Sequence, residues 1–434
     1  MLDLATRAYN HNYNMDPIVR SLFDTDMYKL LMLQFIWKHD EYRNYPVTFE
    51  LINRDKDMRI ADEVPIEEVI EQLDHCRTLR FEPNGLIWLQ GNTFFGKVGM
   101  FEPAFIEWLR SYQLPAYDIE VVDGQFKLRS RGNWVDVTLW EIIFMLVVGE
   151  LKNRKGLKKL GKLDLKVMYA RALTKLYEKL LKLKALDGLN VTDFSTRRRH
   201  NFLYQEEAVL MAKEVLGDKF TGTSNVLIAM RHGLEAKGTN AHELQMVRAT
   251  MAETDQELRD SQYIVPRQWR EYYGDALSML LPDTFGTTQF LMRAPDDIAT
   301  SAGIRFDSKK PIIGGEEAIN WWQHRGIDPR TKLGLFSDGL DVDDIVMLHT
   351  HFYGRMRVGF GWGTLFGNDL RGCAPFEVPL LKPISLVCKV VEAGGRPAVK
   401  LSDNYTKTTG DRAEAARYWN AFGTAGIANA PVIV

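Results

Sequence analysis

From residue 190 onward the sequence alternates between short apolar strands and amphipathic helices, and this alternation decides the class of fold. Each apolar run ends in glycine or polar residues before the next helical pattern begins. Strands that alternate with helices predict a parallel α/β arrangement. The expected strands are 190–194, 219–221, 235–238, 277–281, 303–306, 332–336 and 357–360, and the expected helices are 201–216, 225–233, 242–259, 287–292, 316–324 and 342–352.

The length of this region bears on whether its sheet closes. A complete eight-stranded α/β barrel takes about 250 residues. We therefore expect an irregular or incomplete TIM-like α/β barrel over residues 141–383. An open, doubly wound sheet fits the same pattern, because the number of strands does not distinguish a closed sheet from an open one.

The two ends of the chain have a different pattern. Clusters of β-forming residues are separated by helical segments over residues 1–140, and a hairpin pattern turns at Gly394-Gly395. We expect a second, mixed α/β domain formed by residues 1–140 and completed by residues 384–434. Its expected elements are strands 46–51, 116–121, 384–391 and 398–401 and helices 66–76 and 105–112.

Composition excludes several classes of protein. The net charge of −2 on 434 residues creates no overall field that attracts nucleic acid or an anionic membrane. The longest apolar run, 142–148, is far shorter than the about 20 residues of a membrane helix. Residues 1–17 lack the apolar core of a signal peptide, and three cysteines without CxxC spacing predict neither disulfides nor structural zinc. These features predict a cytoplasmic protein with no membrane or nucleic-acid partner.

A basic run over residues 152–184 keeps nucleic-acid binding open as an alternative. Apolar residues within this run recur at helical spacing, which predicts an amphipathic helix with its lysines in solvent. A solvated helix face is the preferred interpretation, because the chain as a whole is slightly acidic. Retention on heparin that disappears with salt would favour the alternative.

Polar residues gather at the ends of the expected strands. In α/β barrels the loops after the strands converge on the active site. We therefore expect the site to be drawn from these strand ends. They supply Asp193, Ser195, Arg197, Thr221, Gly222, Thr223, Ser224, Gly238, Thr239, His242, Asp283, Thr284, Arg305, Asp307, Ser308, Ser337, Asp338, Gly339, Asp341, Gly361, Gly363 and Thr364.

The last two strand ends predict a phosphate site. Glycine beside hydroxyl residues lets backbone N–H groups approach an anion, and the start of a helix adds partial positive charge. Each turn taken singly is equally typical of an ordinary turn and helix cap. Their adjacent positions in barrel order favour phosphate. The residues concerned are Ser337, Asp338, Gly339, Gly361, Gly363 and Thr364.

Two acidic residues and one histidine have patterns typical of catalysis. Asp283 and Asp307 end successive strands and are candidate Mg²⁺ ligands, with Arg305 able to fork a phosphate. A structural Arg–Asp pair explains these three residues equally well. His242 begins a helix and precedes Glu243, so it is a candidate nucleophile or general base oriented by a carboxylate. A single histidine is, however, more often structural.

The segment 193–200 places an aromatic residue beside arginines at a strand end. Phe194 could stack on a planar heteroaromatic ring, while an arginine such as Arg197 forks a carboxylate. The alternative is a basic helix start, which the helix dipole disfavours.

The motifs together resemble the nicotinate phosphoribosyltransferases, from about residue 18 to about residue 410. Each motif alone is weak, and the order of all of them carries the resemblance. They are Thr25-Asp26-Met27-Tyr28-Lys29, Asp193-Phe194-Ser195-Thr196-Arg197-Arg198, Gly222-Thr223-Ser224-Asn225, Gly238-Thr239-Asn240-Ala241-His242-Glu243, Asp283-Thr284-Phe285, Arg305-Phe306-Asp307-Ser308, Ser337-Asp338-Gly339-Leu340-Asp341 and Phe360-Gly361-Trp362-Gly363-Thr364.

The resemblance implies a homodimer whose active sites lie at the subunit interface. It implies an enzyme that joins nicotinic acid to phosphoribosyl pyrophosphate, giving nicotinate mononucleotide and pyrophosphate in the first step of NAD synthesis from nicotinate. Mg²⁺ is the expected cofactor. ATP is the expected co-substrate, and its hydrolysis is coupled to the reaction through a phosphorylated histidine.

The resemblance also implies roles for individual residues. His242 would carry the phosphoryl group, and Phe194 would stack on the pyridine ring opposite a partner-subunit copy of Tyr28. Arg197 would lie near the ring and its carboxylate. The substrate-binding set also includes Thr223, Ser224, Arg305 and Ser308. Asp283, Arg305 and Asp307 would hold the ribosyl pyrophosphate and metal, while Gly339, Gly361 and Gly363 would line the 5′-phosphate site.

Two positions refine the resemblance. The family often has Asp-Ser-Gly-Asp where this chain has Asp307-Ser308-Lys309-Lys310, which suggests that the two lysines contact phosphates. Ser224 occupies a position that is aspartate in nicotinamide-using relatives, so a preference for nicotinic acid is expected.

The alternatives are a nicotinamide phosphoribosyltransferase and, from another class, a sugar-phosphate aldolase or isomerase on a barrel. The second would need a Schiff-base lysine or a Glu/His base at a strand end.

Overall fold

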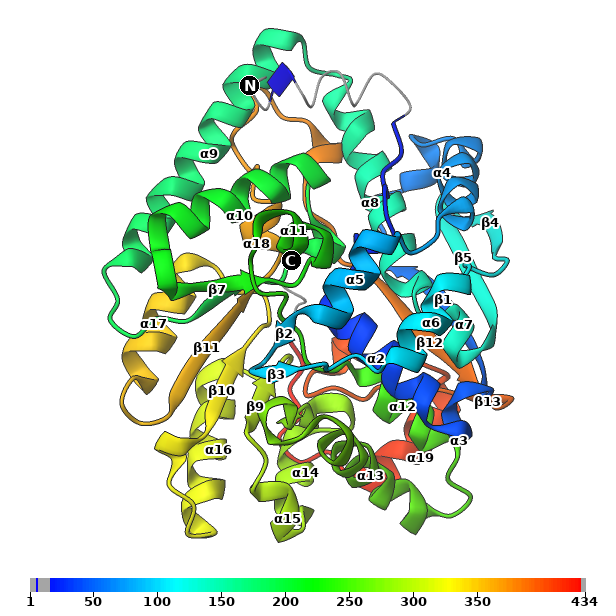
Figure 1. Ribbon diagram of the computed structural model, residues 1–434, viewed down its shortest axis with the longest axis vertical. Coiled ribbons are helices and arrows are strands. Elements are labelled where there is room, and N and C mark those ends of the chain that lie inside the picture. The colour runs from blue at the N-terminus through cyan, green and yellow to red at the C-terminus, as the bar shows by residue number, and fades with distance from the viewer. Residues whose placement is uncertain (1–4, 7–15, 431–434) are drawn as a thin grey trace.

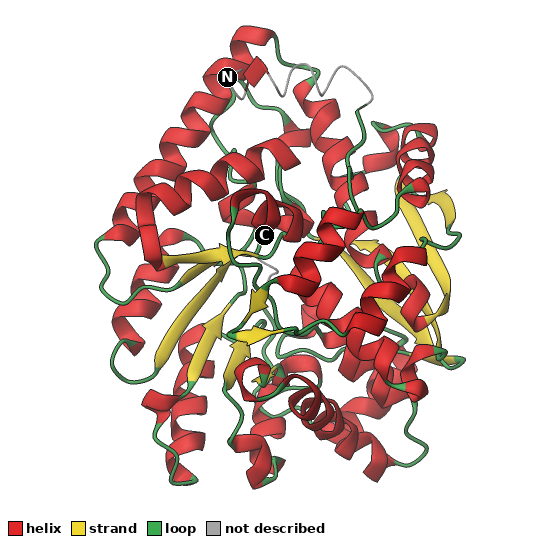
Figure 2. Cartoon of the chain, in the orientation of Figure 1, coloured by secondary structure: helices red, strands yellow, loops and turns green. Residues whose placement is uncertain are grey.

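The computed structural model describes residues 5–6 and 16–430, and two large sheets organise this part of the chain (Figure 1). One sheet is parallel and the other is antiparallel, with helices packed around both (Figure 2). The expectation about residues 1–17 falls mostly outside the described residues.

The parallel sheet is built from the strands expected after residue 190. The order across the sheet is β7-β6-β11-β10-β9-β8. Residues 235–238, expected as a further strand, contribute only a single bridge from Ala236 to Thr223. The bounds are β6 Val191–Asp193, β7 Phe220–Thr223, β8 Met279–Leu280, β9 Gly303–Phe306, β10 Leu333–Phe336 and β11 Arg357–Trp362.

The sheet is ordered as in a barrel, but its ladder does not close. Among the described residues the edge strands β7 and β8 do not pair with each other. The side chain of Asn240 reaches across this gap and donates to the carbonyl of Met279 at 3.3 Å. The fold prediction is thus confirmed as a parallel α/β sheet joined to a second domain, and barrel closure stays a prediction.

Helices follow the strands of the parallel sheet as the alternation predicts. The expected helix 242–259 is divided in two, because Thr254 and Glu257 form a capping box that starts a new helix. The bounds are α10 Phe202–Leu216, α11 Val226–His232, α12 His242–Thr250, α13 Asp255–Tyr273, α14 Thr287–Arg293, α15 Asp296–Ala299, α16 Pro311–His324, α17 Val342–Phe352 and α18 Thr364–Gly367.

The second sheet combines strands from both ends of the chain. Its order is β13-β12-β1-β5-β4, and β1 pairs with β12 over most of its length. An antiparallel pair of this length fixes the two chain ends to each other through backbone hydrogen bonds. The bounds are β1 Pro46–Asn53, β4 Asp118–Val122, β5 Gln125–Asn133, β12 Leu386–Ala393 and β13 Arg396–Pro397.

Helices from the first 184 residues cover this sheet and connect it to the parallel one. The basic run of residues 152–184 is divided between α8 and α9, and Lys152 is buried, where it donates to the carbonyls of Leu380 and Lys382. The remaining bounds are α2 Met27–Lys38, α3 Asp40–Arg43, α4 Ile66–Thr78, α5 Pro83–Gly91, α6 Pro103–Ser111, α7 Trp134–Val137, α8 Trp140–Leu157, α9 Lys162–Lys184 and α19 Arg412–Phe422, with a small ribbon of β2 Thr93–Phe94 and β3 Lys97–Val98.

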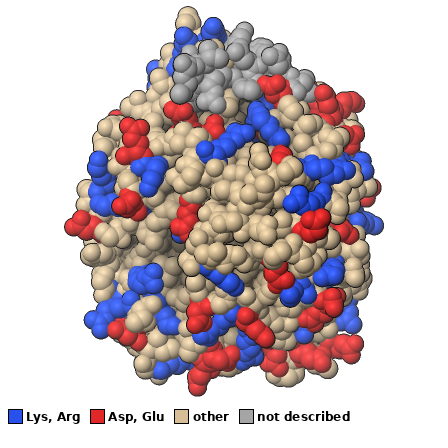
Figure 3. All heavy atoms as spheres, viewed as in Figure 1, with Lys and Arg blue, Asp and Glu red and all other residues tan. Residues whose placement is uncertain are grey.

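Acidic and basic side chains are interspersed over the face seen in Figure 3, in keeping with the small net charge. Lysines of α9 pair with acidic residues nearby, as Lys179 does with Asp341 and Asp369. Within the described residues, no helix has both the length and the apolar character needed to cross a membrane.

Candidate active site

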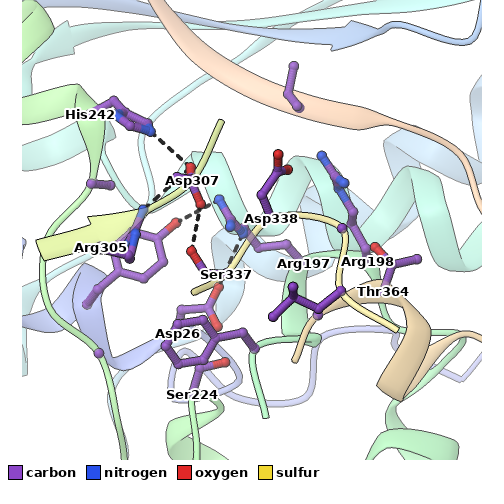
Figure 4. Close-up of a pocket in the computed structure, with 18 of the residues that line it drawn as sticks. Asp26, Arg197, Arg198, Ser224, His242, Arg305, Asp307, Ser337, Asp338 and Thr364 are labelled. Carbon is purple, nitrogen blue, oxygen red and sulfur yellow. Dashed lines mark hydrogen bonds and ion pairs between the residues drawn. The ribbon is translucent and has the colours of Figure 1, made fainter. Parts of the chain in front are cut away.

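A polar cavity lies at the carboxyl ends of the parallel strands, where the antiparallel sheet closes over them (Figure 4). The first motif of the chain reaches this cavity through backbone contacts with the turn after β7. Met27 donates its N–H to the carbonyl of Ser224 at 2.8 Å, and Val226 donates to that of Thr25 at 2.9 Å. Two motifs about 200 residues apart are therefore fixed side by side within one chain.

Tyr28 lines the cavity of its own chain, together with Phe194 and Arg197. The backbone bonds of its motif keep Tyr28 beside β7 of the same chain, and the expected action of Tyr28 on a partner's site stays a prediction. Gly238 makes this position possible, because a Cβ there would stand 2.5 Å from the backbone nitrogen of Tyr28.

The turn that carries Phe194 is fixed by a buried carboxylate. Asp193 accepts hydrogen bonds from the Ser195 backbone N–H at 2.7 Å and from the hydroxyl of Thr223 at 2.7 Å. A Cβ at Gly361 would lie 2.2 Å from the Phe194 ring, so this glycine lets the ring pack flat against β11. Thr223 and Gly361, expected to contact substrate, instead support the aromatic wall.

The three consecutive arginines after Phe194 have different surroundings. Arg197 and Arg198 line the cavity. Arg199 is buried in a bidentate pair with Asp24, with N···O distances of 2.6 and 2.8 Å. The three arginines of this short helical turn are thus divided between the cavity and the packed interior, a division that their spacing in the sequence does not reveal.

His242 lies at the start of α12 and is 3% exposed. Its Nδ1 is 3.1 Å from the hydroxyl of Thr284, and its Nε2 is 3.0 Å from Asp307 Oδ2. Asp307, and not the neighbouring Glu243, is the carboxylate that orients the ring. Burial lowers the pKa of His242 to about 4, although Asp283 and Asp307 oppose this shift, so the imidazole is neutral at neutral pH.

Asp283 and Asp307 converge on the same nitrogen. Asp283 Oδ1 is buried without a hydrogen-bond partner and lies 3.6 Å from His242 Nε2. Ligand atoms of the two carboxylates and His242 lie within 4.8 Å of one another. Two carboxylates that converge beside one histidine favour a cation between them, and carboxylate oxygens are ligands that Mg²⁺ prefers. The geometry thus fits the expected magnesium ligands.

The loops after β10 and β11 form another part of the cavity wall, and Ser337 donates its hydroxyl to Asp307 Oδ1 at 2.9 Å (Figure 4). Ser337, Gly339, Gly363 and Thr364 line it, as the phosphate prediction requires. Asp338 lines it as well, but its carboxylate forms a bidentate pair with Lys407, at 2.5 and 2.6 Å. A carboxylate in this position holds a cation at the cavity wall and does not itself bind phosphate.

The antiparallel sheet and the segment after it supply cations that the sequence interpretation missed. Arg54, Lys389, Lys400 and Lys407 all line the cavity. Lys400 is 3.0 Å from Asp283 Oδ2, and burial lowers the pKa of Lys389 to about 8. These residues are isolated basic positions in strands and loops, so no local pattern marks them.

Two expected contacts point elsewhere. Ser308 donates its hydroxyl to Asp283 Oδ2 at 2.7 Å and accepts from the backbone of Asp403, so it orients the Asp283 carboxylate. Lys309 pairs with Glu317 and donates to Thr288 at 2.6 Å, away from the cavity. The idea that Lys309 and Lys310 contact phosphates is therefore wrong for Lys309, and Lys310 does not line the cavity.

Comparison with known protein families decides the relationship. The family described as "Nicotinate phosphoribosyltransferase (NAPRTase) family" matches residues 189–425, and its N-terminal domain matches residues 23–149. The chain belongs to the nicotinate phosphoribosyltransferase family. The two matches cover both the parallel sheet and the segment that carries Tyr28.

Solved structures of nicotinate phosphoribosyltransferases are similar over nearly the whole chain. The protein from Vibrio cholerae is 29% identical with a TM-score of 0.80, and 94% of each chain is covered. A putative nicotinate phosphoribosyltransferase from Saccharomyces cerevisiae is 25% identical with a TM-score of 0.79, covering 94% of this chain and 99% of that one. The protein from Porphyromonas gingivalis, at 24% identity and a TM-score of 0.81, shares the fold and covers 94% of this chain and 100% of its own.

Proposed function

We propose that the cavity transfers the phosphoribosyl group of phosphoribosyl pyrophosphate to nicotinic acid, forming nicotinate mononucleotide and pyrophosphate. The reaction is the first step of NAD synthesis from nicotinate. The observation that carries this proposal is one cavity with three walls of different chemistry: Tyr28 and Phe194 for a planar ring, His242 and Asp307 with the buried Asp283 beside them, and the glycine loops for a phosphate.

The aromatic wall suits the pyridine ring. Phe194 and Tyr28 offer π-faces to a heteroaromatic ring, and Arg197 beside them can fork its carboxylate. The guanidinium of Arg197 lies 5.7 Å from the centre of the Tyr28 ring, so it also stacks against this wall. Nicotinate would thus be held with its ring nitrogen turned toward the sugar.

The chemical step depends on the alignment of the two substrates and on the neutralisation of the pyrophosphate charge, and it needs no protein nucleophile. The pyridine nitrogen attacks the anomeric carbon, the bond from that carbon to the pyrophosphate oxygen breaks, and pyrophosphate leaves with both electrons. Alignment of the two substrates supplies much of the acceleration. Lys389, Lys400 and Arg54 also line the cavity and would attract the pyrophosphate charge.

Mg²⁺, which we propose as the cofactor, would neutralise part of the pyrophosphate charge when it is bound. Asp283 Oδ1 and Asp307 would be its protein ligands, since the first is an unpartnered buried oxygen. Lys400 and the Ser308 hydroxyl fix the other oxygen of Asp283, so the free oxygen keeps its direction.

ATP, the proposed co-substrate, would phosphorylate His242. The contacts identify the protonated nitrogen of the neutral ring. A carboxylate only accepts, so Nε2–H donates to Asp307 and Nδ1 accepts from the Thr284 hydroxyl. Nε2 faces the cavity and would attack the γ-phosphorus of ATP as its proton passes to Asp307, and ADP would leave with the electrons of the broken P–O bond.

We also propose that each chain builds its own aromatic wall. The support is the cis position of Tyr28 beside Phe194 and Arg197. A homodimer, as the resemblance implied, remains a separate proposal that this arrangement does not need. We propose that the site is the mouth of an incomplete barrel. The side chain of Asn240 reaches across the gap between β7 and β8.

One observation makes nicotinamide the substrate that must be compared with nicotinate. The carboxyl of Asp26 lines the same cavity as Ser224, and burial raises its pKa, partly offset by Arg197 and by hydrogen bonds from the Ser224 and Thr196 hydroxyls. An acidic group is therefore already present near the proposed carboxylate position. The charge of Arg197, 3.8 Å from Asp26 Oδ2, compensates it and favours the nicotinate assignment.

The deciding experiment measures mononucleotide formation from nicotinic acid and from nicotinamide, each with and without ATP. Chromatography separates the two products, and pyrophosphate release gives an independent reading. We expect product from nicotinic acid, with ATP increasing its yield. Equal use of nicotinamide would overturn the substrate assignment, and no product from either base would overturn the proposed function.

A further inference from the structure

Three charged side chains lie buried behind the aromatic wall and take no part in the chemistry proposed above. Lys29 on α2, Glu141 on α8 and Glu243 on α12 are 0%, 3% and 6% exposed. Charges removed from water are costly unless partners satisfy them. The contacts of these three therefore decide what the cluster does.

Lys29 is the centre of the cluster. Its ammonium contacts Glu141 Oε2 at 2.6 Å, a carboxylate oxygen of Glu243, and the Thr138 hydroxyl at 2.9 Å. An ammonium has three donors, and these contacts use all of them. The other oxygen of Glu243 accepts from the Trp134 indole at 2.6 Å and from Thr138 at 2.7 Å. Helices α2, α8 and α12 are thereby joined through one buried charge.

One end of the cluster touches the proposed nicotinate site. Glu141 Oε1 accepts a hydrogen bond from the Tyr28 hydroxyl at 3.3 Å and lies 3.6 Å from a guanidinium nitrogen of Arg197. That nitrogen is also 3.5 Å from the Tyr28 hydroxyl. Glu141 thus sets the positions of two side chains that face the substrate.

The other end touches the proposed phosphoryl acceptor. Glu243 directly follows His242 at the start of α12, and its side chain turns away from the cavity toward Lys29. The start of α12 is therefore anchored through Glu243, while His242 on the cavity side stays free to meet Asp307.

We propose that Lys29, Glu141 and Glu243 form a positioning cluster, in which Glu141 orients Tyr28 and Arg197 for nicotinate and Glu243 holds the helix start that presents His242. This inference rests on the proposed function. Lys29 lies between the two carboxylates, and Lys389 and Arg197 add positive charge near Glu141. Burial alone would raise the pKa of Glu141, but Lys29, Lys389 and Arg197 lower it to about 2, which keeps it ionised.

The first test replaces Glu141 by glutamine, which keeps the shape and removes the charge. Labelled nicotinate is titrated by equilibrium dialysis, and steady-state kinetics are measured in parallel. We expect Kd and KM for nicotinate to rise about tenfold, because one charge-assisted hydrogen bond is lost. The KM for phosphoribosyl pyrophosphate should remain nearly unchanged. Tyr28→Phe added to Glu141→Gln should cost much less than Tyr28→Phe alone costs in the wild type, because the same contact is already broken.

The second test replaces Glu243 by glutamine and measures the rate at which γ-labelled ATP labels the protein. We expect labelling to slow about tenfold. The NH₂ group of the new glutamine would face hydrogen-bond donors, from which the Glu243 carboxylate accepts in the wild type. Glu50→Gln is the matched control for both tests, since Glu50 pairs with Arg129 at 2.5 Å on the antiparallel sheet, outside the cluster. It should leave nicotinate binding and labelling as in the wild type.

The outcomes separate positioning from stability. A lower melting temperature in both variants, with nicotinate Kd and labelling rate unchanged per folded molecule, would overturn the inference. Lys29→Met is not used as the primary variant, because two unpaired buried carboxylates would endanger folding. A wild type that makes no nicotinate mononucleotide would defeat the proposed function, whereas an active wild type with an unaffected Glu141→Gln variant would defeat only the positioning cluster.

Discussion

The two sheets contribute to the cavity in different ways. The parallel sheet presents its residues from loops that follow successive strands, so His242, Asp283 and Asp307 converge because of the topology. The antiparallel sheet contributes Arg54 and Lys389, which face the cavity from strand ends and a strand interior. In the proposed function the parallel sheet thus carries the groups that react, and the antiparallel sheet carries charge that would hold anions. This division predicts that changes in the first act on the chemistry and changes in the second act on binding.

His242→Ala gives the largest expected effect. ATP stimulation should be lost, while slow mononucleotide synthesis without ATP persists, because the pyridine nitrogen and not the histidine attacks the sugar. Incubation with γ-labelled ATP should give acid-labile label on the wild type alone. Equal labelling of the variant would remove His242 from this role and leave the parallel sheet without its reacting group.

Ser224→Asp should act on substrate choice. The new carboxylate would join Asp26 at the proposed nicotinate end, and a second negative charge there raises the cost of binding an anion. We expect kcat/KM for nicotinate to fall by about 1–3 kcal/mol in transition-state free energy. Nicotinamide use should be affected less. If the variant uses nicotinate as efficiently as the wild type does, Ser224 does not select the substrate, and Arg197 becomes the candidate for this role.

Lys389→Met probes the antiparallel sheet. Among the described residues the Lys389 ammonium has no close ion pair, although the charge of Glu141 opposes the lowering of its pKa. We expect KM for phosphoribosyl pyrophosphate to rise by about tenfold, the scale of one desolvated charge contact, while kcat changes little. Initial-rate kinetics over a range of salt concentrations measure both constants, and the salt dependence of KM should weaken. A fall confined to kcat would contradict the division between the sheets.

Mixing two inactive variants should have the smallest effect. Tyr28→Ala removes part of the aromatic wall, and Asp307→Ala removes a proposed metal ligand of the same cavity. Because both residues line the cavity of one chain, mixed assemblies should remain inactive. The assay records activity after subunits are exchanged, with co-purification of differently tagged chains as the check that mixed assemblies form. Recovered activity would show that Tyr28 acts across an interface.

Sequence reasoning identified the parts of the site that lie on repeated local patterns. Strand ends followed by helix starts located His242, Asp283 and Gly339, because a polar residue after an apolar run is a local signal. It also located the strands of the parallel sheet to within a few residues. It misassigned Thr223 and Gly361, since residues that support a ring and residues that contact a substrate share the same strand ends.

What the sequence by itself determined was the class of fold and the family, since both follow from the order of short motifs along the chain. Only the tertiary structure decided that Tyr28 lines the cavity of its own chain, that Asp307 orients His242, and that Glu243 turns toward Lys29. Each of these is a contact between segments far apart in sequence. The direction in which a buried charged side chain turns depends on which partner offsets the cost of its burial, and that partner is fixed by packing and not by its neighbours in the chain.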